Sequence, residues 1–414
     1  MDVMHERCAG IDISKSDVKV CIRVPATGKH RRRRTEVRTF PAMTNDLLTM
    51  RDWLISEGVT LVAMEATGSY WKPVFYLLEQ TFECWLLNAR HMKAVPGRKT
   101  DVKDAEWIAK LVEHGLVRPS FVPPPPIRQL RDLTRYRTEV TRERTRETQR
   151  LHNLLEDTGI KLTSVASDML GKSGRAMLEA LIAGERNPHV LAELALGRLR
   201  SKQPALLEAL TGHFTHHHAF LARAMLDRID EATTMQARLN TAIDAHLHPF
   251  HQHIQLLATI PGISARTAEV VLAEIGADIT QFPTAGHLAS WAGVCPGNHE
   301  SAGKSTTGTT RPGDPWLKAV LGQAAISAAR SKNTYLAARY RRIMARRGRK
   351  RALVALQHSI LTSIWHMFTH NIDYHDLGAN YFLERTGKTR ATRRLISQLN
   401  HLGYQVMLNP LQAP

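Results

Sequence analysis

Four carboxylates near the N-terminus are the residues best suited to chemistry: Asp12, Glu65, Asp101 and Asp104. Asp12 lies in an apolar run typical of a strand, Glu65 ends a second such run, and the other two share one face at the start of a predicted helix. Each acid alone is most simply a surface carboxylate. Together, acids from strand ends and a helix offer the oxygen ligands that Mg²⁺ or Mn²⁺ takes beside phosphate. The set therefore predicts a metal site for phosphate chemistry.

Basic charge dominates the composition. The chain has 414 residues, with 56 lysines and arginines against 38 aspartates and glutamates, and a net charge of +18. Arginines are concentrated in Arg31–Arg34 and again between Arg341 and Arg351. Such runs are often only solvated surface, but two of them on a strongly basic chain favour a polyanionic partner. The candidate nucleic-acid contacts in the second run are Arg346, Arg347, Arg349 and Lys350.

Cysteine usage and the N-terminus bear on the cellular compartment. The four cysteines lack metal or redox spacing and lie in apolar surroundings, which predicts reduced core residues: Cys8, Cys21, Cys84 and Cys295. The N-terminus lacks the basic start and apolar run of a signal peptide, and no apolar stretch is long enough to span a bilayer. We therefore expect a cytoplasmic, nucleoid-associated protein with no membrane partner.

Strand and helix signals alternate over residues 8–115. Three apolar runs in hairpin order come first, and a helix over 44–57 with Thr44 as its cap follows. The strand that ends at Glu65, a helix near 70–80, a strand at 82–88 and the helix opened by Asp101 complete the segment. This order predicts an α/β domain, a mixed sheet with helices on its faces, and it suits the ribonuclease-H-like fold.

Helical signals dominate the rest of the chain. Pro123–Pro126 form a stiff spacer before the charged, glycine-free residues 127–157, which predict a long helix and a candidate coiled-coil arm. Residues 165–245 predict further helices. The expected domains are 1–122 (catalytic α/β domain), 123–250 (helical dimerisation region), 251–350 (second compact domain) and 351–414 (helix and tail).

The second compact domain begins with a helix, a Pro261-Gly262 turn and a helix over 264–275, the outline of a helix-hairpin-helix. The amides of such a turn can meet a phosphate at the helix N-terminus. Residues 295–315 are rich in Gly, Ser, Thr and Pro and predict a loop. Helices are expected at about 316–330 and at 352–369.

Two further motifs favour ordinary structure over chemistry. Ala166 to Ser173 fits a loose phosphate-loop pattern, but its surroundings predict helix where that motif needs a strand, so a glycine-containing helix break is favoured. His213 and His217 have the i, i+4 spacing of zinc ligands but no HExxH context, which favours a polar helix end.

Several short motifs, in order, resemble a known family: insertion-sequence transposases with a DEDD acidic tetrad, whose studied relatives are recombinases guided by a bridge RNA. The matching stretches are Gly10-Ile11-Asp12, Met64-Glu65-Ala66-Thr67-Gly68, Lys99-Thr100-Asp101-Val102-Lys103-Asp104-Ala105, Ile260-Pro261-Gly262-Ile263, Ala289-Ser290-Trp291-Ala292-Gly293 and Glu300-Ser301-Ala302-Gly303-Lys304. They cover roughly residues 8–115 and 255–345.

The resemblance implies a RuvC-like N-terminal domain, with the tetrad at Asp12, Glu65, Asp101 and Asp104, and a C-terminal transposase domain with a nucleophilic serine at Ser301. Ser305 is close enough in sequence to be the alternative nucleophile. The resemblance further implies Mg²⁺ or Mn²⁺, DNA and a guide RNA as partners, and a dimer or tetramer in which acids and serine come from different subunits. Lys304 and Arg311 are candidate phosphate contacts.

Three other functions compete with a serine recombinase. In a metal-only nuclease, such as a junction resolvase, Ser301 would be incidental and no covalent protein–DNA link would form. An actin-like sugar kinase or ATPase also opens with a strand and an aspartate, like Gly10-Ile11-Asp12, but needs glycine-rich phosphate loops that this chain lacks. If the chain is a non-catalytic nucleic-acid-binding protein, Glu65→Gln should leave its activity unchanged.

Overall fold

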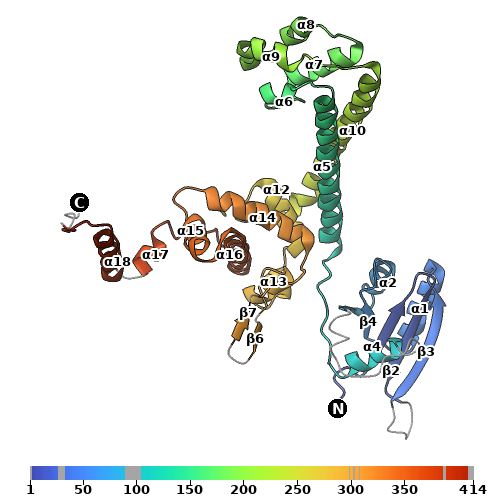
Figure 1. The fold of residues 1–414 in the computed structure, drawn as a ribbon. Coiled ribbons are helices and arrows are strands. Elements are labelled where there is room, and N and C mark those ends of the chain that lie inside the picture. The colour runs from blue at the N-terminus through green and yellow to red at the C-terminus, as the bar shows by residue number, and fades with distance from the viewer. Residues whose placement is uncertain are drawn as a thin grey trace. The chain divides into compact units, whose positions relative to one another are not determined.

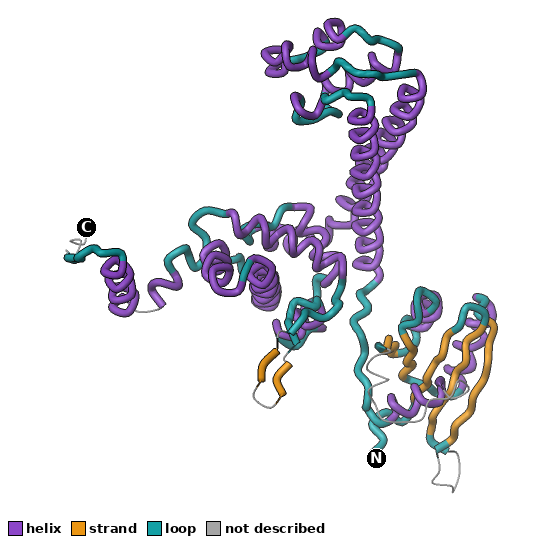
Figure 2. The backbone as a smooth tube through the Cα atoms, viewed as in Figure 1, coloured by secondary structure: helices purple, strands orange, loops and turns teal. Residues whose placement is uncertain are grey.

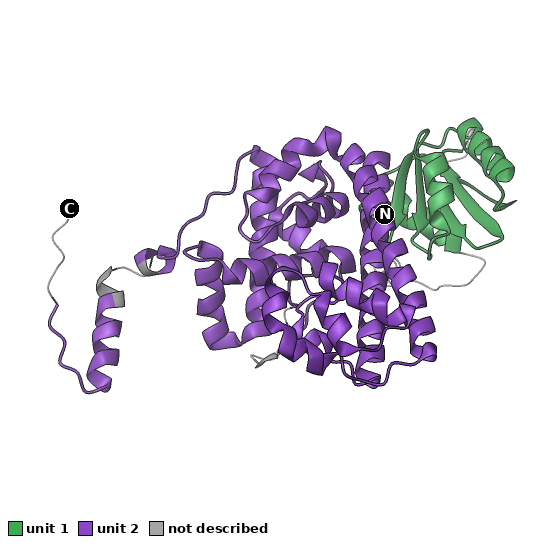
Figure 3. Ribbon diagram, turned by 90° about the horizontal axis from the view of Figure 1, so that it is seen from above, with its two compact units in different colours: residues 1–122 green, residues 123–414 purple. Residues whose placement is uncertain are grey.

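The computed structural model describes residues 2–26, 33–88, 104–297, 299–301, 304–306, 308–385 and 388–408. The chain forms two compact units, Met1–Val122 and Pro123–Pro414 (Figure 3). Among the described helices, none combines the length and apolar character that crossing a bilayer requires.

A five-stranded mixed sheet forms the centre of the first unit (Figures 1 and 2). Its strands are β1 (Cys8–Ile13), β2 (Asp17–Val24), β3 (Arg34–Pro41), β4 (Leu61–Glu65) and β5 (Glu83–Leu87), in the order β3-β2-β1-β4-β5. The first three are antiparallel neighbours, and β4 runs parallel to both β1 and β5. Parallel neighbours need crossover connections, and helices α1 (Thr44–Ser56) and α2 (Trp71–Leu78) provide them. The predicted mixed sheet with flanking helices is confirmed.

Helices cover both faces of this sheet. Ile11 and Met64 face the apolar core that α1 and α2 complete. On the opposite face, Leu61 and Ala63 pack against α4 (Asp104–Glu113). Successive residues of a strand point to opposite faces, so the position of a residue along β1 or β4 decides which helices it meets.

The second unit contains two long antiparallel helices, the first of which begins it (Figure 1). Helices α5 (Pro125–Asp157) and α10 (His216–Leu247) lie side by side, and Arg144 Nε donates to Thr233 Oγ1 across them at 2.9 Å. Shorter helices pack at one end of the pair: α6 (Leu162–Val165), α7 (Lys172–Ala183), α8 (Pro188–Glu193), the 3₁₀ helix η2 (Gly197–Lys202) and α9 (Gln203–Ala209). The helical character predicted for this region is confirmed, and coiled-coil packing stays a prediction.

The remainder of the unit is a cluster of helices with one short hairpin. The elements are η3 (His248–Phe250), α11 (His251–Ala258), α12 (Ala265–Ile275), η4 (Ile279–Gln281), α13 (Ala285–Trp291), β6 (His299–Ser301), β7 (Lys304–Thr306), α14 (Pro315–Arg330), α15 (Tyr335–Arg347), α16 (Arg349–His370), α17 (Tyr381–Arg385) and α18 (Lys388–His401). The fully buried Glu274 at the end of α12 ties the cluster to α5, because Arg135 donates to both of its oxygens at 2.8 Å.

Two local predictions differ from the structure, and packing accounts for one glycine. Helix α1 is capped at Met43, without a side-chain hydrogen bond, so Thr44 is its first residue rather than its cap. The predicted loop 295–315 contains the β6–β7 hairpin. Gly262, at φ +93°, lies where a Cβ would come within 2.6 Å of the Ala324 carbonyl oxygen, so close packing of the turn on α14 accounts for this glycine.

The cysteines match the prediction in part. Cys8 and Cys21 are buried free thiols of the sheet, and burial raises the pKa of Cys8 to about 11 and that of Cys21 to about 12. Cys84 and Cys295 are free but only half-buried.

Candidate active site

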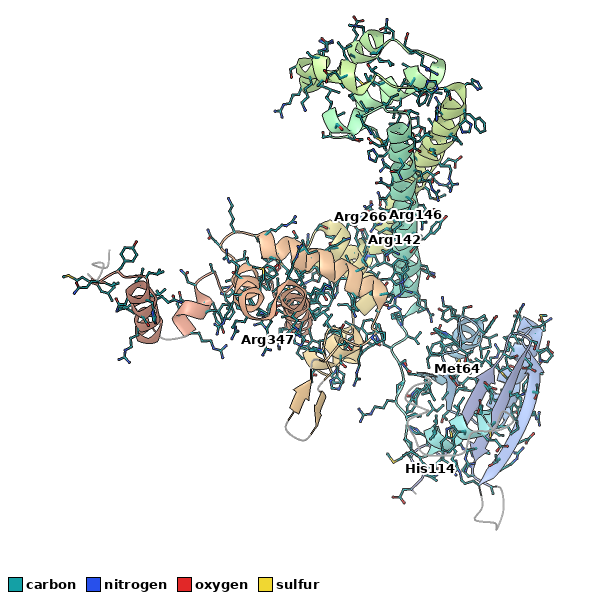
Figure 4. The ribbon with its side chains drawn as sticks, in the orientation of Figure 1. Met64, His114, Arg142, Arg146, Arg266 and Arg347 are labelled. Carbon is teal, nitrogen blue, oxygen red and sulfur yellow. The ribbon has the colours of Figure 1, made fainter. Side chains whose placement is uncertain are left out.

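The strand register brings two of the predicted acids together. Ile11 of β1 pairs with Met64 of β4 (labelled in Figure 4), so the next residues along these parallel strands are Asp12 and Glu65. Ile11 and Met64 face the core of α1 and α2. By alternation, Asp12 and Glu65 both belong to the face that α4 covers. Both are half-buried at the carboxyl ends of central strands, as the sequence predicts.

A close approach of α4 to β1 places the third acid on that same face. A Cβ on Gly10 would lie 2.4 Å from the Ala105 carbonyl oxygen and 2.3 Å from the Ala109 amide nitrogen. Helix α4 can therefore pack this close to β1 only because residue 10 is glycine. Asp104 begins α4, directly before Ala105, and is half-buried. Gly10 is two residues before Asp12 on the same face of β1, so the helix start lies over the strand end that carries Asp12.

The opposite end of α4 is fixed by a buried ion pair. Glu113 is 1% exposed and accepts from Arg23 Nε of β2 at 2.6 Å and from Arg33 Nε at 2.7 Å. A buried carboxylate is costly without cationic partners, so Glu113 is stable only where both guanidinium groups reach it. Glu113 and the Gly10 contact therefore hold α4 in register with the sheet, and so position Asp104.

The fourth acid of the predicted tetrad, Asp101, lies outside the described residues. Within the described ranges, no three His, Cys, Asp or Glu side chains are grouped closely enough to enclose a metal ion. The donor set nevertheless suits a hard divalent cation, because Asp12, Glu65 and Asp104 offer only carboxylate oxygens on one half-buried face. These three residues are the ones that could hold such an ion, with Asp101 three positions before Asp104.

The predicted nucleophile lies on the β6–β7 hairpin. Its backbone register pairs Ser301 with Lys304 and Ser305 with Glu300, so the two serines belong to different pairs. The base of the hairpin is closed by a bridge between Pro296 and Thr310. Gly308 lies where a Cβ would be 1.9 Å from the Gly297 carbonyl oxygen, so this contact requires glycine. Both contacts hold the two ends of the hairpin segment together.

A basic groove of about 950 Å³ begins at this hairpin base. One wall is formed by residues on either side of the hairpin, Val294, Pro296, Gly297, Gly308, Thr309 and Thr310. The other is formed by α15 and α16, with Arg339, Arg347, Lys350, Arg351, Val354, Ala355 and His358. Arg347, labelled in Figure 4, is the last residue of α15.

The structure divides the predicted nucleic-acid contacts into groups. Arg347 and Lys350 line the groove, whereas Arg346, Arg349 and Arg311 are exposed but are not among its lining residues. Lys304 lies on β7, opposite Ser301. Arg339 and His358 line the groove and were not predicted from the sequence, because they lie 19 residues apart on two helices and only the fold brings both to the hairpin base.

The two motifs set aside in the sequence form ordinary structure. Gly171 caps α7 and follows the short helix α6, without the strand that a phosphate loop requires. The histidines beginning at His216 open α10, where His218 and Thr215 form a capping box. The favoured readings, a helix break and a polar helix end, are confirmed.

Comparison with known proteins assigns the chain to a class. Residues 9–160, which include all four acids, match the DEDD_Tnp_IS110 family model, described as "Transposase". Residues 254–341, which include Ser301, match the model described as "Transposase IS116/IS110/IS902 family".

Individual relatives agree with the family models. A "Probable family 20 transposase" of Pseudomonas aeruginosa is 29% identical over 278 residues, 66% of this chain and 72% of the relative. The "Transposase for insertion sequence element IS1111A" of Coxiella burnetii is 25% identical over 325 residues, 76% of this chain and 79% of the relative. An IS110 protein of Streptomyces coelicolor is 38% identical over 93 residues, 22% of this chain and 21% of the relative.

With an acid-bearing mixed sheet and both family matches, the chain is a DNA transposase. More particularly, it belongs to the IS110 family of insertion-sequence transposases, and the predicted family is confirmed. The DEDD type implies, in general terms, dependence on a divalent metal.

Proposed function

We propose that this transposase cuts and rejoins DNA with the acid tetrad and with Ser301, which the family resemblance assigns to different subunits. The observation that carries the proposal is the common face of Asp12, Glu65 and Asp104, which three elements of the first unit bring together. Carboxylates on one half-buried face of a strongly basic chain suit a phosphodiester substrate with a cation between the negative charges.

The reaction is a transesterification. The Ser301 hydroxyl attacks a DNA phosphorus, a serine–phosphate ester bond forms, and the bond from phosphorus to one deoxyribose oxygen breaks. The serine proton passes to a base and the leaving deoxyribose hydroxyl takes up a proton. Attack by another strand's hydroxyl reverses the step and frees the serine, so strands are resealed without ATP. Serine is a weak nucleophile at its ordinary pKa and needs such activation.

Asp12, Glu65 and Asp104, with Asp101, would hold the divalent cation, Mg²⁺ or Mn²⁺. When bound, the cation would neutralise charge on the phosphate as the transition state forms. The residues of the chain fix where this can happen: the β1–β4 register sets Asp12 beside Glu65, and Gly10 sets the height of α4 above them.

Three further assignments belong to this proposal. The strand order β3-β2-β1-β4-β5, antiparallel and then parallel, supports a RuvC-like identity for the first unit. The helix-turn-helix outline formed by α11 and α12 supports a helix-hairpin-helix element, although Gly262 is explained by packing. A guide RNA that selects the sites, a dimer or tetramer joined through the α5–α10 region, and association with the nucleoid follow from the family resemblance and the basic charge.

Strand cleavage of element-end DNA by purified protein, with Mg²⁺ or Mn²⁺, tests the proposed acids. Asp12→Asn, Glu65→Gln and Asp104→Asn should each reduce cleavage by at least about 100-fold, the cost of removing one group that stabilises transition-state charge. Asp52→Asn is the matched control, because Asp52 lies on α1, which packs on the other face of the sheet, and its side chain is 64% exposed. If Asp52→Asn and the three others cleave alike, the acid face is not the active site.

A further inference from the structure

We infer that the groove between the hairpin base and the α15–α16 corner holds the phosphodiester backbone of the DNA strand that Ser301 attacks. This inference rests on the proposed function, because it takes Ser301 as the nucleophile. It adds a binding site with its own residues, Arg339, Arg347, Lys350 and Arg351, to the chemistry proposed above.

The segment that surrounds the groove is strongly basic. Between Asp314 and Asp373 the sequence contains 11 lysines and arginines and no acid. Three groove cations, Arg347, Lys350 and Arg351, are exposed, and within the described residues no carboxylate forms an ion pair with any of them. Like charges crowded at one corner repel each other unless an anion lies among them. A polyanion is therefore the complementary ligand.

The fold concentrates this charge. Gly348 joins α15 to α16 with φ +79°, a conformation that favours glycine, so the chain turns sharply between Arg347 and Arg349. Two arginine-rich helix ends are thereby brought to one corner. Arg339, which also lines the groove, donates to Tyr335 Oη at 3.2 Å and adds a fourth positive charge to the lining.

The remaining lining suits a nucleotide strand better than a free anion. Pro296, Val354 and Ala355 add apolar surface to the lining, on which sugars and base faces can lie. A volume of about 950 Å³ exceeds what a single phosphate needs. The groove can therefore accommodate several linked nucleotides.

Proximity to the hairpin identifies the strand. Gly297 lines the groove, and Ser301 is four residues further along the chain, at most about 14 Å away. With one phosphate per about 3.4 Å of helix axis in each strand of a duplex, this length of axis corresponds to roughly four nucleotides. The strand held in the groove is thus the one whose phosphate Ser301 can reach.

Two double variants of the full chain provide the test. Arg347→Gln with Arg351→Gln removes two groove cations, and Arg346→Gln with Arg349→Gln removes the same charge from the same corner outside the groove. The probe is a fluorescent element-end DNA oligonucleotide, and binding is measured by anisotropy at two salt concentrations. Thermal unfolding midpoints confirm that both variants fold.

The groove variant should bind the DNA at least about tenfold more weakly than the matched control at equal salt, the effect of a lost charge-assisted hydrogen bond. Equal affinity of the two variants would overturn the inference. An RNA oligonucleotide of the same sequence is measured in parallel. Weaker binding confined to RNA, with DNA affinity unchanged, would also overturn it, because the groove would then belong to an RNA.

A third variant separates this inference from the proposed function. Ser301→Ala should bind the DNA like the wild type, because the groove residues remain. If the groove variant binds normally while Ser301→Ala loses the covalent DNA adduct, the groove inference fails and the serine mechanism stands. If Ser301→Ala still forms the adduct, the serine assignment fails, and the DNA affinities still report on the groove.

Discussion

Gly10→Ala should disable strand cleavage without touching any acid. The added Cβ would meet three backbone atoms of α4: the Ala109 nitrogen at 2.3 Å, the Ala105 oxygen at 2.4 Å and the Ala109 Cα at 2.9 Å. Backbone atoms of a helix cannot rotate away as a side chain can. Since ordinary contact begins near 3.4 Å, α4 must move about 1 Å from β1.

That displacement has two measurable consequences. Overpacking of this kind destabilises a fold by about 1–3 kcal/mol. Asp104, one residue before Ala105, moves with the helix, and a displacement of about 1 Å in a catalytic group can cost about 100-fold in rate. We therefore expect cleavage of element-end DNA to fall about 100-fold, with a lowered but cooperative thermal unfolding transition.

Gly286→Ala is the matched control for this variant. Gly286 lies in α13, and its added Cβ would come no closer than 3.5 Å to another atom, Thr284 Oγ1. An alanine inside a helix is favoured over glycine by about 0.5–1 kcal/mol. This control should cleave normally. A Gly10→Ala protein that cleaves at the wild-type rate would refute the claim that α4 must approach β1 closely to position Asp104.

Further predictions concern acids, burial and charge. Asp101→Asn should abolish cleavage while the unfolding midpoint stays at the wild-type value, and normal cleavage would remove Asp101 from the tetrad. Glu113→Ala should lower the free energy of unfolding by about 3–5 kcal/mol in urea titrations, because it leaves Arg23 and Arg33 without their buried partner; a loss below about 1 kcal/mol would contradict this role. Burial and the nearby Arg339 charge lower the pKa of His358, so below pH about 6.5 the unfolded chain binds this proton more readily and stability falls. A DNA phosphate in the groove should raise that pKa in an NMR titration, and an unchanged value on DNA binding would contradict occupation beside His358.

Elements with a strong local signal were predictable from the sequence. The apolar runs that became β1 and β4 end in Asp12 and Glu65, and because parallel strands share a carboxyl edge, the meeting of these acids followed from their positions. The long charged stretch that became α5 was equally clear, since it lacks glycine and has an apolar stripe.

Features that depend on contacts distant in sequence were not predictable. The β6–β7 hairpin was interpreted as loop, because its residues are of turn-forming types and its strands are three residues each. Gly10 has no local mark of its role, which is set by Ala105 and Ala109 about 100 residues later. The groove likewise joins residues on both sides of the hairpin to Arg339 and His358, and the sequence showed only the basic run at its rim.

Mass spectrometry of the protein–DNA adduct directly tests whether Ser301 is the nucleophile. Wild-type protein is incubated with element-end DNA and divalent metal, denatured, and digested with protease and nuclease, and the peptide that carries a nucleotide is sequenced. We expect a nucleotide phosphate on Ser301 of the wild-type protein and none on the Glu65→Gln protein. A modified Ser305 would reassign the nucleophile. DNA that is cut in a Glu65-dependent way without any modified serine would contradict the proposed serine mechanism and indicate a metal-only nuclease.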